Sequence, residues 1–174
     1  MKSPFFYLIF ALIFTAILIF YNQMGGFREP EITYEPVKEY TLAGRKFKGK
    51  ASDPAMEQLF SEMKQIKEEN QYQGSLVMVW YKEVSRKNEP VEVFIGIEVL
   101  SGEVAPEQLE TIILRMGGVI RAKISAHTSV MPSPERVLKM IRIFAEKNSY
   151  KLQDIVIDKY PAESVVLTEI PVRF

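Results

Sequence analysis

Residues 91–99 read VEVFIGIEV, and residues 165–173 read VVLTEIPVR. Both stretches are rich in β-branched residues and are bounded by polar segments, which is typical of strands. Within them, VFIGIEV occupies in the first half of the domain the place that VLTEIPV occupies in the second. Each stretch comes last in a series of strand, helix, strand and strand. The sequence therefore predicts two related strand-helix-strand-strand repeats.

The elements of the first repeat are recognised by their periodicity. A strand is predicted over residues 39–49, and Ser52-Asp53-Pro54 marks a helix start, because proline suits the first turn. Apolar residues then recur at helical spacing over residues 56–66. Strands over residues 75–84 and 91–99 complete the repeat.

The second repeat follows the same order. It contains an alternating strand over residues 120–127, a helix that starts at Ser133-Pro134, and strands over residues 154–160 and 165–173. Residues 104–114 connect the repeats and are predicted to include a short helix. Two such repeats predict an α+β domain, in which an antiparallel sheet carries two helices on one side. A groove between the related halves is the expected ligand site.

An apolar stretch precedes this domain. Residues 4–21 read PFFYLIFALIFTAILIFY, and no charged residue lies between Lys2 and Arg28. A membrane-spanning helix needs about 20 apolar residues. The run reaches this length if the weakly polar residues Ser3 and 22–24 sit at the membrane interface. No small-residue cleavage motif follows, so the pattern predicts an uncleaved transmembrane helix.

These features divide the chain into three parts. Residues 1–26 are predicted to be a signal anchor, residues 27–36 a linker with two prolines, and residues 37–174 the soluble domain. Lys2 precedes the span, whereas acidic residues accompany Arg28 after it. The positive-inside rule then favours a single-pass protein with its N-terminus in the cytoplasm and its domain outside.

Composition excludes several functions. The chain carries 22 basic and 22 acidic side chains, and a near-neutral protein is a poor partner for nucleic acid. The absence of cysteine excludes disulfides, thiolate metal sites and cysteine nucleophiles. The single histidine, His127, leaves no room for a multi-histidine metal site and is expected at the surface. No metal or cofactor is predicted.

Four segments resemble the GyrI-like small-molecule-binding family, the effector-binding domains of bacterial AraC-type and MerR-type regulators. They are VKEYTLAGRKFKG (37–49), IILRMGGVIRAKISA (112–126), SPERVLKMIRIFAEKNSY (133–150), and the closing DKY (158–160) with LTEIPV (167–172). They occur in the family's order, and the resemblance extends over residues 37–174, the whole predicted domain. SOUL-type haem-binding proteins share this fold, but the chain lacks their second-half segment and offers only His127 as a histidine ligand.

Glu169 is the candidate central residue of the site. Its neighbours on the same side of the strand are Val165, Leu167 and Pro171, all apolar. A carboxylate among apolar groups is unfavourable unless it meets a cation or takes up a proton, so it selects for lipophilic cations. The resemblance implies this role for the glutamate of the TEI motif. The alternative is a glutamate at the rim that faces solvent.

Aromatic residues are expected to complete the site, because rings stack on planar ligands and attract cations. The candidates are Trp80, Tyr81, Phe94 and Tyr160. Gly96 is the first-repeat counterpart of the glutamate and is expected to leave room opposite the carboxylate. The alternative for each aromatic residue is a place in the hydrophobic core.

Three functions are compatible with these residues. The first is a membrane-anchored module that binds amphipathic cationic or planar aromatic small molecules. The second is a hydrolase of strained electrophiles, because the resemblance includes members that hydrolyse cyclopropane-containing toxins; Glu169 would be its general base, and Tyr160 would hold the electrophile. The third is a non-catalytic scaffold tethered at a membrane. One good carboxylate, with no evident second acid or nucleophile, favours binding.

Overall fold

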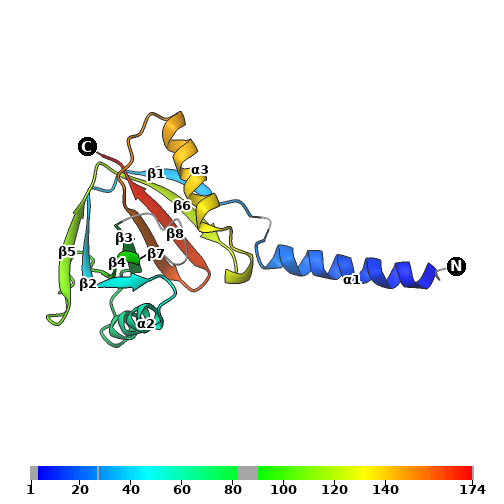
Figure 1. Cartoon of the computed structure of the whole chain (residues 1–174), viewed down its shortest axis with the longest axis horizontal. Coiled ribbons are helices and arrows are strands. Elements are labelled where there is room, and N and C mark those ends of the chain that lie inside the picture. The colour runs from blue at the N-terminus through cyan, green and yellow to red at the C-terminus, as the bar shows by residue number, and fades with distance from the viewer. Residues whose placement is uncertain (1–3, 27, 82–89, 174) are drawn as a thin grey trace.

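The computed structural model describes residues 4–26, 28–81 and 90–173 (Figure 1). The helices are α1 (Pro4–Gln23), α2 (Pro54–Glu69), α3 (Pro134–Lys147) and the short 3-10 helix η1 (Thr128–Val130). The strands are β1 (Glu31–Glu35), β2 (Glu39–Lys50), β3 (Leu76–Trp80), β4 (Pro90–Glu98), β5 (Glu110–Arg115), β6 (Val119–Ser125), β7 (Val156–Ala162) and β8 (Val165–Pro171). They form one antiparallel sheet in the order β1-β6-β8-β7-β3-β4-β2-β5.

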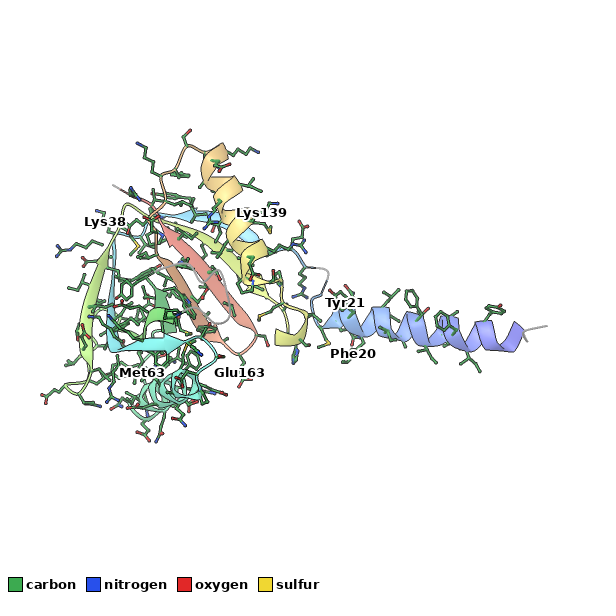
Figure 2. All side chains as sticks on the ribbon, viewed as in Figure 1. Phe20, Tyr21, Lys38, Met63, Lys139 and Glu163 are labelled. Atoms are coloured by element: carbon green, nitrogen blue, oxygen red, sulfur yellow. The ribbon has the colours of Figure 1, made fainter. Side chains whose placement is uncertain are left out.

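The two helices of the domain begin at the predicted capping residues. The Asp53 side chain accepts from the Ala55 amide at the start of α2, and the Ser133 side chain accepts from the Arg136 amide at the start of α3. Helix α2 packs on β2, β3 and β4 with Met63 buried beneath it, and α3 packs on β1, β6 and β8 (Figure 2). Both helices lie on the same face of the sheet, here called the outer face.

The opposite, inner face carries its own buried cluster. Its members are Tyr40, Leu42, Val77, Val79, Phe94, Met116, Val119 and Ile157. Neither α2 nor α3 contributes a buried residue to this cluster, because their apolar stripes pack into two other clusters on the outer face. The inner side chains are buried because the sheet curls into a half-barrel around them (Figure 1). The curl decides which distant residues meet on this face.

The predicted fold of two three-stranded repeats plus a membrane helix needs correction. Over its described residues the chain has three α-helices and eight strands. Strand β1 lies in the predicted linker 27–36 and pairs with β6, and β5 lies in the connector 104–114, where a short helix was expected, and pairs with β2. Both strands are short and lie at the edges of the sheet, and no residue of either strand is fully buried. Part of the predicted strand 75–84 lies outside the described residues.

The prediction of a membrane anchor over residues 4–21 is also wrong. No helix in the described part of the chain is both long and apolar enough to cross a membrane. Helix α1 ends at Gln23, and the chain then docks on the domain. The His127 amide donates to the Met24 carbonyl at 2.9 Å, and Gly25 is buried. The single-pass location, with a cytoplasmic N-terminus and an external domain, is therefore wrong as well.

Candidate functional site

Glu169 lies at the centre of the inner face. On β8 it stands directly opposite Arg121 of β6 and Ile157 of β7, and it is 0% exposed. Arg121 Nε donates to Glu169 Oε1 at 2.7 Å, and Tyr40 Oη donates to Oε2 at 2.9 Å. Tyr40 belongs to β2, four places from β8 in the sheet order, so this hydrogen bond spans the inside of the half-barrel. Both carboxylate oxygens are therefore engaged by protein groups.

The polar contacts continue on both sides of this carboxylate. Arg121 Nη1 lies 3.8 Å from a Glu35 oxygen. On the other side, Lys159 Nζ lies 4.3 Å from the centroid of the Tyr40 ring and 2.7 Å from Glu98 Oε1. Lys159 is only 6% exposed, so this pair is well shielded from water. We call Glu35, Arg121, Glu169, Tyr40, Lys159 and Glu98 the inner network.

The ionisation of the network follows from burial and neighbouring charge. Burial raises the pKa of Tyr40, and the Glu169 carboxylate raises it further, so the phenol remains a hydrogen-bond donor. Desolvation lowers the pKa of Arg121, but the adjacent Glu169 outweighs this and the net direction is upward. A charged guanidinium therefore neutralises the buried carboxylate.

The structure separates the predicted aromatic residues between the two faces. Phe94 belongs to the same inner cluster as Ile157, the cross-strand neighbour of Glu169, and Tyr81 packs against that cluster. Trp80 and Tyr160 pack instead into clusters of the outer face. Successive side chains of a strand point to opposite faces, so a one-residue difference decides the side. Trp80 and Tyr160 are thus not brought to Glu169.

Gly96 is aligned with inner-face residues of the neighbouring strands, but no open space lies beside it. It pairs with Gly44 of β2, and a Cβ atom at Gly96 would lie 2.3 Å from the Ala43 carbonyl oxygen. Two facing glycines let β2 and β4 approach closely. The missing side chain makes room for a strand, and the expected room opposite the carboxylate is filled by backbone.

The sequence does not single out the other members of the inner network. Arg121 was visible as part of the polar side of the strand 120–127, and opposite charges on one face of paired strands attract. That signal does not identify Glu169 as the partner, because β6 and β8 are far apart in the chain. Tyr40 and Lys159 had no separate signal, since their meeting depends on the curl of the sheet.

Trp80 has a different partner on the outer face. Its Nε1 donates to Asp158 Oδ2 at 2.9 Å, and Thr168 Oγ1 donates to Asp158 Oδ1 at 2.7 Å. Burial raises the pKa of Asp158, although the two hydrogen bonds act in the opposite direction. A carboxyl group with a raised pKa holds its proton more tightly in the folded than in the unfolded state. Its contribution to stability is therefore complete at low pH and is lost as pH rises through the raised pKa.

Replacing Asp158 with asparagine is expected to remove this pH dependence of the stability, because the amide accepts and donates hydrogen bonds without ionising. The free energy of unfolding, measured with urea between about pH 4 and 7, should depend less on pH than in the wild type. Asp154→Asn is the control, since that carboxylate is 95% exposed. Equal pH slopes for the wild type and Asp158→Asn would contradict the assignment.

The structure also places the single histidine. His127 is exposed at the start of η1, as predicted. Among the described residues, no three histidine, aspartate or glutamate side chains lie close enough together to hold a metal ion.

Comparison with solved structures shows that other proteins share this fold. No family model and no curated protein matches the chain. Among solved structures, the C-terminal domain of EcmrR superposes with a TM-score of 0.57 at 11% identity, over 83% of this chain and 98% of that domain. The fold is that of GyrI-like effector-binding domains. The resemblance seen in the sequence is thus confirmed for the fold.

Two further solved structures share this fold, one of a protein bound to an organic cation and one of a hydrolase. SAV2435, solved bound to tetraphenylphosphonium, has a TM-score of 0.52 at 10% identity, over 83% of this chain and 94% of its own. A hydrolase from Listeria innocua has a TM-score of 0.52 at 12% identity, over 83% of this chain and 92% of its own. At such identities the likeness shows the fold alone.

Proposed function

We propose that the protein binds amphipathic organic cations on the inner face of its sheet, with Glu169 as the group that meets the positive charge. The observation that carries the proposal is a carboxylate with 0% exposure at the centre of an apolar half-barrel. An anion in such a place demands a cationic partner. SAV2435, which has the same fold and was solved with a lipophilic cation, supports this ligand class.

Arg121 supplies the cation when no ligand is bound, and its position suggests how a ligand can replace it. Its side chain is 24% exposed, at the border between the buried carboxylate and solvent. It lies tightly against Glu169, at 2.7 Å, and loosely against Glu35, at 3.8 Å. Rotation toward Glu35 would keep the guanidinium paired while its place beside Glu169 is taken. Binding then becomes an exchange of one cation for another.

The walls of this site suit the apolar part of such a ligand. Phe94, Val79 and Ile157 lie next to one another across β4, β3 and β7 on the inner face. Aromatic and aliphatic walls with a single charge at the centre are typical of small-molecule sites. The ring of Phe94 can also attract a cation.

The contacts of Glu169 argue against the hydrolase alternative. A general base must reach a proton of the attacking water. Both Glu169 oxygens already accept hydrogen bonds, one from Arg121 and one from Tyr40, and the side chain has no exposed surface. Binding requires that the inner face opens and that one of these partners is exchanged, whereas catalysis would in addition require a water molecule held against a free carboxylate oxygen.

Glu169→Gln tests the proposal. The amide keeps the size of the side chain and removes its charge, so affinity for tetraphenylphosphonium should fall at least about tenfold, equivalent to about 1.4 kcal/mol. Isothermal titration calorimetry measures the change. Glu163→Gln is the matched control, because Glu163 is exposed in the turn of the β7–β8 hairpin (Figure 2). Equal affinity of the wild type and Glu169→Gln would exclude a role for the carboxylate, and wild-type protein that binds no cation would favour a scaffold.

A further inference from the structure

A cavity of about 420 Å³ lies on the outer face, on the opposite side of the sheet from Glu169. It is formed where the first turns of α2 meet β3 and β7. Met56, Phe60, Met78 and Tyr160 form its apolar wall. Its volume falls within the range of roughly 300–1,000 Å³ that is common for small-molecule sites.

Two aromatic rings and two thioethers give this wall its chemistry. The rings of Phe60 and Tyr160 meet edge to face, with centroids 5.3 Å apart and an interplanar angle of 81°. Methionine is polarizable and unbranched, so Met56 and Met78 can adapt to the shape of a guest. Ring faces attract organic cations, and a methionine-lined wall accepts alkyl or aryl groups.

The Tyr160 hydroxyl adds a hydrogen-bond donor to the wall. It contacts Met78 Sδ at 3.7 Å, and a thioether is a weak acceptor. Burial raises the pKa of Tyr160, so the hydroxyl keeps its proton. The donor is therefore available to a guest that carries an oxygen.

The charged residues that line the cavity, among those the structure describes, are acidic. Asp53 and Glu57 stand at its edge, and within the described part of the chain none of the residues that line it is basic. Asp53 is held in place because its side chain accepts from the Ala55 amide. The N-terminus of α2 contributes roughly half a positive charge, which the two carboxylates outweigh. The cavity thus combines an apolar, aromatic wall with a negative edge.

We propose that this cavity, here called the outer pocket, is a second binding site for small organic cations that carry an aromatic or alkyl group. The cation would lie between the carboxylates of Asp53 and Glu57, and the apolar group would lie against Phe60 and Tyr160. This site is separated from Glu169 by the thickness of the sheet. It therefore does not depend on the function proposed for the inner face.

Methionine methyl groups can report on the two faces separately. Met56 and Met78 line the outer pocket, whereas Met116 belongs to the inner cluster. We expect titration of protein labelled with ¹³C-methyl methionine to shift the Met56 and Met78 signals saturably with benzyltrimethylammonium. Trp80 packs in the same outer cluster as Phe60, so its fluorescence gives a second readout of this pocket.

Substitutions then assign the contacts. Phe60→Leu keeps an apolar side chain but removes a ring, and should weaken binding about tenfold. The double variant Asp53→Asn with Glu57→Gln should weaken binding roughly threefold to tenfold, while asparagine preserves the helix cap. Glu68→Gln, at the exposed far end of α2, should leave the affinity unchanged.

The outcomes distinguish the two sites. Saturable shifts of Met56 and Met78 that weaken in the Phe60 and carboxylate variants support the outer pocket. Shifts of Met116 alone would overturn it and leave the inner-face proposal standing. No shift of any of the three signals would overturn it as well, and so would an affinity that Phe60→Leu does not change.

Discussion

Replacing Arg121 with methionine is expected to lower the free energy of unfolding by about 3 kcal/mol at pH 7. Methionine keeps an unbranched apolar stem but leaves the Glu169 carboxylate, 0% exposed, without a counter-ion. Tyr40 still donates one hydrogen bond, but a neutral phenol does not compensate a full charge. Urea unfolding followed by circular dichroism measures the loss.

Arg121→Met and Glu169→Gln should lower the free energy of unfolding by different amounts. Glu169→Gln leaves Arg121 partly in solvent and near Glu35, so it should cost only about 1–2 kcal/mol. The double variant Arg121→Met with Glu169→Gln contains no unpaired buried charge and should recover part of the loss. A double-mutant cycle gives the coupling, which we expect to be about 1–3 kcal/mol. Additive single effects would show that the pair is not the source of stability.

The single variant Arg121→Met also tests the exchange of cations on the inner face. Without Arg121, the carboxylate has no internal competitor for a ligand's charge. Tetraphenylphosphonium should therefore raise the melting temperature of Arg121→Met more than that of the wild type, because ligand that binds only the folded state stabilises it. An equal shift in both proteins would mean that the ligand does not take the place of the guanidinium.

Gly96→Ala is expected to destabilise the protein by about 3 kcal/mol or more. The added Cβ would lie 2.3 Å from the Ala43 carbonyl oxygen and 2.9 Å from Gly44 Cα, both of which are backbone atoms. Relief requires β2 and β4 to separate, which weakens the hydrogen bonds around the Gly44–Gly96 pair. Thermal or urea unfolding measures the effect.

Gly49→Ala is the matched control on β2. A Cβ there would meet the Phe47 ring at 2.6 Å, and that ring can rotate away. We expect a loss clearly smaller than for Gly96→Ala. If both substitutions cost the same, the close approach of the strands at Gly96 is not what requires glycine.

Elements with strong local signals were predicted from the sequence, and those without them were not. Asp53 and Ser133 marked the starts of α2 and α3, because capping depends on neighbouring residues alone. The edge strands β1 and β5 were missed, since a short strand at an edge acquires its state by pairing with a distant partner. The membrane prediction over residues 4–21 failed as well, because no helix in the described part of the chain is both long and apolar enough to cross a membrane.

The sequence by itself determined the α+β character of the chain and the chemistry excluded by the absence of cysteine, and it drew attention to the TEI segment around Glu169 as a candidate site. Only the tertiary structure decided that Arg121 and Tyr40 meet that carboxylate and that Trp80 and Tyr160 face the other way. The physical reason is the separation along the chain over which each kind of interaction acts. Periodicity and capping act over a few residues, whereas strand order, register and the curl of the sheet arise from contacts between segments far apart in the chain.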